Sequence, residues 1–270
     1  MKIQKPISGF LSTLILTSCL QFLYASYEVD LLAFALSGKC DGNLSGMFLG
    51  QICQQLNRAG KKINLKGADL RGAVFAGYKI KNINLENANL CGANFAGCSI
   101  KQSCLKNTSL CGANFVGSIL QEVDFSRSKM PGINFTDSYI KKCNYSHVFG
   151  KCANFLASTL NEITFSKSLL ESANFANCAL SGCHFSHAIL YKAVFNNGLL
   201  LKCTFNRSKI DDVNFKNNHI RRSDLSNIAF NYAKNSCTFK NALFYNTKMN
   251  PEQKPLLYRV QLANIIFVKN

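Results

Sequence analysis

The feature that most constrains this chain is a five-residue period that runs through most of its length. Every fifth residue from Leu65 to Phe230 is apolar, apart from Gly150. A mostly small residue, such as Ala, Ser or Cys, stands two places before each of these positions. An α-helix repeats every 3.6 residues and a strand every two, so neither produces this pattern. We therefore expect an architecture built from repeats.

The repeat unit resembles that of the pentapeptide-repeat family, which is usually written A(D/N)LXX. The segments ADLRG, ANLCG, ANFAG, ANFVG, VDFSR and VNFKN carry the resemblance, which covers about two-thirds of the chain. It implies an all-β solenoid, a right-handed four-sided β-helix in which large and small residues point inward. Four units would make one coil of 20 residues, giving about eight to nine coils.

A second period of twenty residues supports this fold. CGANF begins at Cys91 and again at Cys111, and each side of the predicted coil keeps its own residue type. One column is aliphatic and runs from Ile80 to Ile220. Identical side chains would stack at the strand spacing of roughly 4.8 Å. The predicted structural core is the phenylalanine column Phe75, Phe95, Phe115, Phe135, Phe155, Phe175, Phe195 and Phe215.

Two places interrupt the repeat. Gly150 replaces a large residue, which predicts a bulge or a local register shift with Phe149 supplying the missing bulk. After Phe230 the period slips and resumes at Phe239, which predicts an irregular corner over residues 231–238.

Both ends of the solenoid, predicted over residues 63–249, need covers. Apolar residues from Leu44 to Leu56 have helical spacing, which predicts a helix within an N-terminal cap over residues 26–62. Residues 250–270 begin with Asn250 and Pro251, a helix-start pattern. We expect a C-terminal helix there that caps the solenoid or, as the resemblance suggests, joins two copies in a homodimer.

The N-terminus has the pattern of a secretory signal. Lys2 and Lys5 precede an apolar run over residues 7–23, and no acidic residue occurs before Glu28. We expect a signal peptide over residues 1–25 and a periplasmic or secreted protein. The alternative is a lipoprotein signal over residues 1–18 that anchors the protein to a membrane through Cys19. The apolar sequence after Cys19 favours the first interpretation.

The charge of the chain indicates an anionic partner. Lysine and arginine number 31 against 14 acidic residues, a net charge of +17. Such a surface attracts nucleic acid, anionic lipid or acidic protein, although charge also serves solubility. The side of the coil that follows the aliphatic column is basic, and its candidate anion-binding residues are Lys81, Lys101, Lys141, Lys142, Lys202, Arg221 and Arg222.

The sequence offers little for catalysis. It contains no glycine-rich phosphate loop, nucleophile elbow or metalloprotease helix. Cys183, His184 and His187 have a tempting spacing, but the repeat points Cys183 inward and both histidines outward, so we expect no metal site. We likewise expect no cofactor and no small-molecule substrate.

Cys91 and Cys111 are a candidate redox pair. Both occupy an outward position at the same corner of neighbouring predicted coils. In an oxidising compartment they could form a labile disulfide, and otherwise they would stay thiols. The competing interpretation is that two small residues fill a corner beside glycines.

These features together predict an exported, non-enzymatic binding or scaffold rod, or a secreted effector, for an unknown macromolecule or anionic surface. The alternative is a DNA mimic that binds a topoisomerase, as in some members of the family that the chain resembles. That mimicry requires a strongly negative rod, so the charge of +17 and the signal sequence disfavour it.

Overall fold

The computed structural model describes residues 43–228, 239–251, 261–263 and 266–267. The chain divides into two compact units, residues 1–39 and 40–270, and every described residue lies in the second. The predicted signal peptide, the lipoprotein alternative and the predicted irregular corner at 231–238 lie outside the described residues. Within the described part, no helix is long and apolar enough to cross a membrane.

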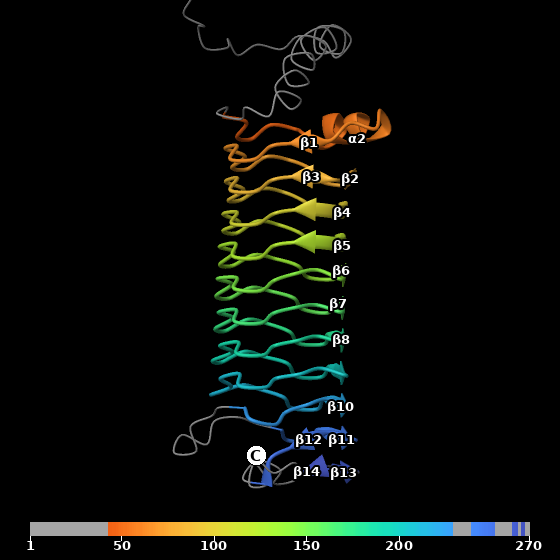
Figure 1. Ribbon diagram of the computed structural model, residues 1–270, viewed down its shortest axis with the longest axis vertical. Helices are drawn as coiled ribbons and strands as arrows, with labels where there is room; N and C mark the ends of the chain where they lie inside the picture. The colour runs from red at the N-terminus through yellow and green to blue at the C-terminus, as the bar shows by residue number, and fades with distance from the viewer. Residues whose placement is uncertain (1–42, 229–238, 252–260, 264–265, 268–270) are drawn as a thin grey trace, which may run out of the picture. The chain divides into compact units, whose positions relative to one another are not determined.

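The second unit is a parallel β-solenoid of stacked coils (Figure 1). Ile100 pairs with Leu120, and Leu120 pairs with Ile140, so each coil advances by twenty residues. Four such ladders surround the coil, and we number its faces by their inward columns. Face 1 contains the column Leu65–Leu225, face 2 Leu70–Ile210, face 3 Phe75–Phe215 and face 4 Ile80–Ile220. The predicted four-sided coil is confirmed.

Most of the strands are short because each face ends in a turn after one pentapeptide. Face 4 supplies most of them, and β4 and β5 continue across the corner onto face 1. The strands are β1 (Ile63–Asn64), β2 (Lys79–Lys81), β3 (Ile83–Asn84), β4 (Ser99–Cys104), β5 (Ile119–Asp124), β6 (Tyr139–Lys141), β7 (Thr159–Asn161), β8 (Ala179–Ser181), β9 (Leu199–Leu201), β10 (His219–Arg221), β11 (Leu243–Tyr245), β12 (Lys248–Met249), β13 (Gln261–Ala263) and β14 (Ile266–Phe267).

Two columns of stacked aromatic rings run side by side through the interior, and the ring planes of one column are nearly perpendicular to those of the other. The face 3 phenylalanines are fully buried, and successive ring centroids lie between 4.5 Å, for Phe75 and Phe95, and 5.1 Å, for Phe195 and Phe215. Rings of the face 1 column meet them edge to face, as Phe155 and Phe165 do at 5.6 Å and 84°. This geometry is favourable for aromatic pairs beyond the area that they bury.

The small inward residues satisfy backbone carbonyls between coils. Ser158 Oγ donates a hydrogen bond to the Phe135 carbonyl at 2.6 Å, and Cys178 Sγ donates to that of Phe155 at 2.8 Å. A buried carbonyl without a donor would cost stability. Serine and cysteine at this position therefore combine small volume with a useful donor.

The asparagines before the face 3 phenylalanines stabilise turns more than they link coils. Asn94 Oδ1 accepts a hydrogen bond from the Ala96 amide at 3.0 Å, and Asn134 does the same for Thr136. The hydrogen bond between coils is longer, at 3.5 Å from Asn114 Nδ2 to Asn94 Oδ1. The main role of this asparagine column is thus local to each coil.

Gly150 does not break the register. Phe149 pairs with the residue twenty positions on, Leu169, so the predicted bulge is wrong. A Cβ atom at Gly150 would lie 3.1 Å from Leu170 Cδ2 and 3.6 Å from Met130 Cγ, which shows that side chains of the neighbouring coils occupy the space. The side chain of Phe149 is 47% exposed and does not supply the missing bulk.

A C-terminal helix is predicted over residues 250–270, of which residues 252–260, 264–265 and 268–270 lie outside the described part. The described residues 261–263 and 266–267 form strands, in which β13 pairs with β11 and β14 pairs with β12. Asn250 is buried, and its side-chain amide donates a hydrogen bond to Asn227 Oδ1 at 3.1 Å. The edge of the last coil provides a ready template for strand pairing, which explains why these described residues are extended. The predicted homodimer through a C-terminal helix stays a prediction.

The coil before that edge is longer than the others. Phe239 stacks on Phe215 at 4.8 Å and 4°, and β11 pairs with β10 through His219 and Leu243. The offset is therefore 24 residues instead of 20. The phenylalanine column continues through the insertion because the four additional residues leave the pairing on face 4 intact.

The N-terminal end combines a partial coil with one helix, α2 (Gly50–Arg58). Asn43 already pairs with Asp69, so coil pairing begins before the predicted boundary at residue 63. Ile52 and Leu56 of α2 are buried. Asn57 Nδ2 donates a hydrogen bond to the Lys81 carbonyl, and Asn57 Oδ1 accepts one from the Lys81 amide, both at 2.7 Å. These bonds satisfy backbone groups of β2 that would otherwise lack a partner strand.

Phe135→Ala should destabilise the solenoid by about 3–5 kcal/mol, because it leaves a cavity inside two ring stacks. Phe135→Leu should cost clearly less, since it keeps most of the buried volume. Urea unfolding of both variants measures the difference. A loss below about 1 kcal/mol for the alanine variant would contradict the stacked interior.

Tyr145→Phe should leave stability unchanged or raise it by about 1 kcal/mol. Tyr145 lies between Phe125 and Phe165 in the face 1 stack, and its buried hydroxyl has no hydrogen-bond partner in the described part of the chain. Burial also raises the pKa of this phenol well above its ordinary value. Urea unfolding provides the measurement. A clear loss of stability would show that the hydroxyl is in fact satisfied.

Candidate anion-binding face

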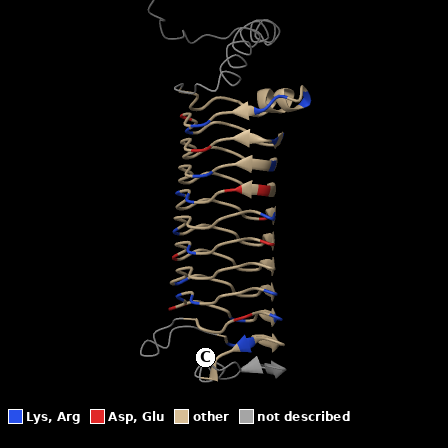
Figure 2. Cartoon of the chain, viewed as in Figure 1, with Lys and Arg blue, Asp and Glu red and all other residues tan. Residues whose placement is uncertain are grey.

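The cations predicted from sequence lie on one side of the solenoid, face 4. Lys81, Lys101 and Lys141 belong to strands β2, β4 and β6, and Arg221 belongs to β10. The other three occupy the turn position that follows each strand residue. These are Lys142, Lys202 and Arg222, with φ angles of 53°, 54° and 51°. Figure 2 shows that basic residues recur along both the strands and the turns of the coils.

The basic residues of this face form three groups along the solenoid. These are Lys81 with Lys101, Lys141 with Lys142, and Lys202 with Arg221 and Arg222. Gln121 lies in register between Lys101 and Lys141, and two acidic residues, Glu122 and Glu162, follow in the turns. Hydrogen bonds from the Gln121 and Gln102 side chains lower the pKa of Glu122, and nearby lysines lower it further. The face is therefore not one continuous strip of positive charge.

The first group lines a hollow of about 720 Å³ between α2 and face 4. Lys81 and Lys101 lie in register on neighbouring strands, and Ile119 is exposed at the edge. None of the described residues that line the hollow is acidic. The lining comprises Gln54, Asn57, Arg58, Lys79, Ile80, Lys81, Ser99, Lys101 and Ile119.

Sequence reasoning missed Arg58 and Lys79 as members of this group. Arg58 reaches the hollow only because α2 packs against the first strands, which no repeat spacing predicts. Lys79 stands one place before the inward Ile80 and so faces outward by the alternation of the strand, a signal that was available. Unlike the isolated cations farther along, these residues surround a common space.

The predicted cysteine pair is placed at one corner of adjacent coils. The Gly92 amide donates a hydrogen bond to the Cys111 carbonyl at 2.9 Å. Cys91 is half-buried, Cys111 is exposed, and both thiols are free. Partial burial raises the pKa of Cys111, and a hydrogen bond with the Cys91 thiol raises it further. The Cys111 thiol therefore stays protonated at neutral pH more than an ordinary surface thiol does.

The histidine–cysteine cluster is dispersed by the coil. Cys183 is buried, with Sγ 3.3 Å from the Leu160 carbonyl, while His184 Nδ1 lies 3.0 Å from Thr204 Oγ1 on the next coil. His187 is exposed at the following corner. Among the described residues, no three His, Cys, Asp or Glu side chains come together as metal ligands.

Comparison with known proteins identifies the repeat. The family model described as pentapeptide repeats matches eight copies in the chain, across residues 63–137 and 151–207. No curated protein matches the sequence. The chain is similar to the solved structure of HetL, a pentapeptide repeat protein involved in heterocyst differentiation regulation from the cyanobacterium Nostoc sp. strain PCC 7120. That match has 19% identity, covers 82% of this chain and 92% of HetL, and has a TM-score of 0.36.

A second similar structure is QnrB1, a plasmid-mediated fluoroquinolone resistance protein. It is 16% identical, with coverage of 75% of this chain and 98% of QnrB1 and a TM-score of 0.44. A pentapeptide repeat protein of the Arabidopsis thaliana thylakoid lumen is 24% identical over 40% of this chain and 72% of its own length, with a TM-score of 0.37.

Peroxide treatment should join Cys91 to Cys111. The two thiols would lose two protons and two electrons to form the disulfide, and hydrogen peroxide would be reduced to two waters. Because the pKa of Cys111 is raised, the reaction should be slow at pH 7 and faster at pH 9. Alkylation and mass spectrometry, with Cys111→Ser as the control, would detect it. A link from Cys91 to Cys143 or Cys203 would contradict the coil register.

Proposed function

Because this chain belongs to the pentapeptide-repeat family, we propose that it is a non-enzymatic binding or scaffold protein whose solenoid holds an anionic macromolecule or surface. Pentapeptide-repeat proteins are generally structural or binding proteins. The inward columns are packed with buried side chains from coil to coil, which suits a rigid support. Function would then reside in the outer columns, whose residue types change from coil to coil.

The composition supports an anionic partner. Even if each of the 14 acidic residues paired with one base, 17 of the 31 lysines and arginines would remain unpaired. Four such pairs occur among the described residues: Lys66–Glu86, Arg71–Asp69, Lys106–Asp124 and Lys151–Glu171. The excess charge gives the surface a long-range attraction for anions.

The observation that carries the proposal is the arrangement of cations beside α2. Lys81 and Lys101 are aligned on neighbouring strands, and like charges in this position destabilise a sheet. Lys79 and Arg58 line the same hollow without an acidic neighbour in its lining. An anionic group in the hollow would relieve this repulsion, so binding and the stability of this end would be coupled.

We further propose that the protein is exported. The support is the charged and then apolar N-terminal sequence, with Lys2 and Lys5 before residues 7–23. Cell fractionation with N-terminal sequencing of the mature chain would test this. A mature chain that begins near residue 26 supports a signal peptide, whereas a blocked, lipid-bearing Cys19 supports the anchored alternative. Retention of Met1 in a soluble cell fraction would contradict both.

The DNA-mimic alternative receives no support from the charge. A mimic of DNA must repel other polyanions and present negative charge along its length. This chain carries a net charge of +17.

The variant K79Q/K81Q/K101Q should weaken binding to heparin and reduce its dependence on salt concentration, because fewer counterions would be released. The matched control, K66Q/K106Q/K151Q, removes the same charge from lysines that are already paired with carboxylates. It should have a smaller effect. Titrations at low and high salt measure both variants.

The wild-type chain must first bind at least one anionic probe at low salt, such as heparin, duplex DNA or phosphatidylglycerol vesicles. Failure with all three would contradict the proposed function. An equal loss of heparin binding in both variants would show that total charge matters and that the hollow does not.

A further inference from the structure

Face 2 carries an exposed apolar stripe that the basic face does not explain. Phe149, Leu169 and Ile189 occupy the same repeat position on three successive coils and pair in register. The side chains of Phe149 and Leu169 are 47% and 39% exposed, and Ile189 is half-buried. Earlier coils place polar residues at this position of face 2, namely Asp69, Asn89 and Ser109. The stripe is therefore a local departure from the repeat.

Cations border this stripe. Five consecutive coils place a basic residue or histidine at the corner between faces 1 and 2, and all five side chains are exposed: Arg127, His147, Lys167, His187 and Arg207. Lys129 and Lys209 occupy the stripe position on the coils immediately before and after it. Counted on the face 2 side alone, over residues 127–132, 147–152, 167–172, 187–192 and 207–212, these five coils carry seven Lys or Arg against three carboxylates. One of the three, Glu171, is paired with Lys151 at 3.2 Å.

The backbone conformation does not explain why basic residues and histidines gather at this corner. The five residues have φ angles of 56–61°, a conformation that suits glycine or asparagine better than long side chains. At the same corner of the other described coils the chain has Gly67, Asn87, Asn107 and Asn227. Basic residues and histidines thus stand in place of glycine and asparagine at this corner only where the apolar stripe and its two bordering coils lie.

Backbone pairing argues against a peptide strand as the partner of face 2. The amides of Phe149, Leu169 and Ile189 each donate to the preceding coil, with N–O distances of 3.0, 2.9 and 2.9 Å. An added strand needs free backbone groups at a sheet edge. What face 2 offers is apolar side chains surrounded by positive charge, and these are the two attractions that hold a protein on an anionic lipid surface.

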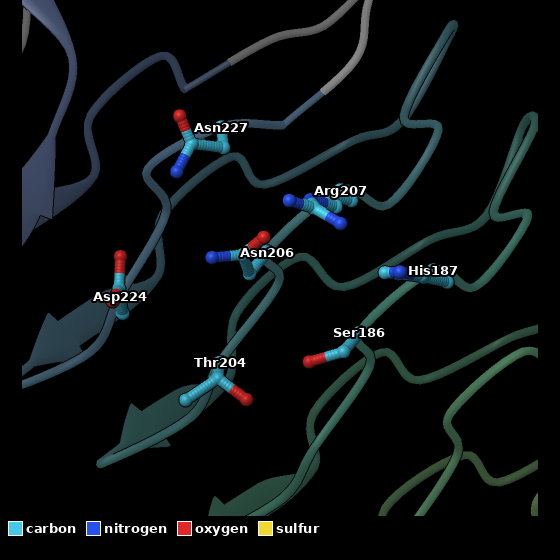
Figure 3. Close-up of a pocket in the computed structure, with 7 residues that line it drawn as sticks. All are labelled: Ser186, His187, Thr204, Asn206, Arg207, Asp224 and Asn227. Carbon is cyan, nitrogen blue, oxygen red and sulfur yellow. The ribbon is translucent and has the colours of Figure 1, made fainter. Parts of the chain in front are cut away.

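A polar hollow of about 750 Å³ lies beside the same corner on face 1. Figure 3 shows His187 and Arg207 on successive coils, with Ser186 and Asn206 beside them. Hydroxyl, amide and guanidinium groups are hydrogen-bond donors that suit a phosphate. Asp224 lines the far side, where its carboxylate accepts hydrogen bonds from the amide and the hydroxyl of Ser226.

We propose that face 2 from Arg127 to Asp212 docks on an anionic lipid surface, with Phe149, Leu169 and Ile189 entering the interface between headgroups and the surrounding cations binding lipid phosphates. This inference rests on the proposed binding function and goes beyond it, because it names a second binding surface, separate from the hollow beside α2, and a partner for that surface. The stripe supplies apolar area, and the corner cations supply attraction of roughly 1 kcal/mol each near a charged bilayer.

The first test removes the apolar stripe. F149N/L169N/I189N should bind vesicles of phosphatidylglycerol and phosphatidylcholine about tenfold or more weakly than wild type in a sedimentation assay. Asparagine occurs naturally at this position, where Asn89 accepts a hydrogen bond from the Cys91 amide at 3.3 Å, so the fold should persist. The control Y139N/L199N changes exposed apolar residues at the same repeat position of face 4, outside the hollow, and should alter binding less than twofold.

The second test removes charge. R127N/K167N/R207N should weaken vesicle binding by about a hundredfold at low salt, at roughly fivefold per cation. K142N/K202N/R222N removes three cations from the same turn position after face 4 and should have a much smaller effect. Wild type should bind pure phosphatidylcholine vesicles weakly, and thermal melting should show that all four variants remain folded.

The outcomes separate this inference from the proposed function. Binding to heparin or duplex DNA without binding to anionic vesicles would overturn the lipid surface and leave the proposed function standing. Vesicle binding that ignores both face 2 variants, or that the face 4 variants weaken equally, would overturn the site. If wild type binds none of the three anionic probes at low salt, the proposed function fails first.

Discussion

The stacking of identical side chains at the spacing of paired strands is the interaction on which the rest of the molecule depends. Ring centroids in the face 3 column lie 4.5 to 5.1 Å apart, which is close to the distance between hydrogen-bonded strands. A phenylalanine every twenty residues thus contacts its own kind above and below. The backbone hydrogen bonds that join successive coils and the ring contacts in the interior require the same spacing between coils. Neither interaction therefore distorts the other.

This constraint also organises the surface. A residue that faces outward has its neighbours twenty positions away, and any preference repeated at that interval becomes a line of side chains along the solenoid. The aligned Lys81 and Lys101, the thiols of Cys91 and Cys111, and the apolar stripe of face 2 all arise in this way. None of them is apparent from residues that are adjacent in the sequence. The solenoid thus brings outward-facing residues that are twenty positions apart in the sequence into compact groups that could bind a partner.

Sequence periodicity predicts the regular part of this protein well, because the inward column is both the pattern and the core. The helix near the N-terminus was likewise predictable from the spacing of Ile52 and Leu56, although coil pairing extends through Asn43 and Phe48 before it. The seven predicted cations do share face 4. Their division by Glu122 and Glu162 was visible in the sequence but acquires meaning only with the strand register.

The wrong or missed predictions share one cause: a local sequence pattern does not show which side chains and strand edges of the neighbouring coils a residue will contact. Residues 261–263 and 266–267 were included in a predicted helix, but they pair as strands with β11 and β12. Gly150 suggested a bulge, yet Met130 and Leu170 of the adjacent coils fill its place. Arg58 joins the lysines of the hollow through the packing of α2. Contacts between elements distant in sequence decided each case.

The central claim is that every twenty residues advance the chain along the solenoid by the spacing of one coil. Distances between spin labels test this claim most directly. Labels attached through genetically encoded azides at Asn107, His187 and Asn227 would leave the native cysteines untouched. The account predicts about 19 Å for 107–187, four coils apart, and about 29 Å for 107–227, six coils apart, measured between backbones. Pulsed electron paramagnetic resonance should therefore find that the 107–227 distance exceeds the 107–187 distance by about two coil spacings. Equal distances, or a shorter second distance, would contradict the account.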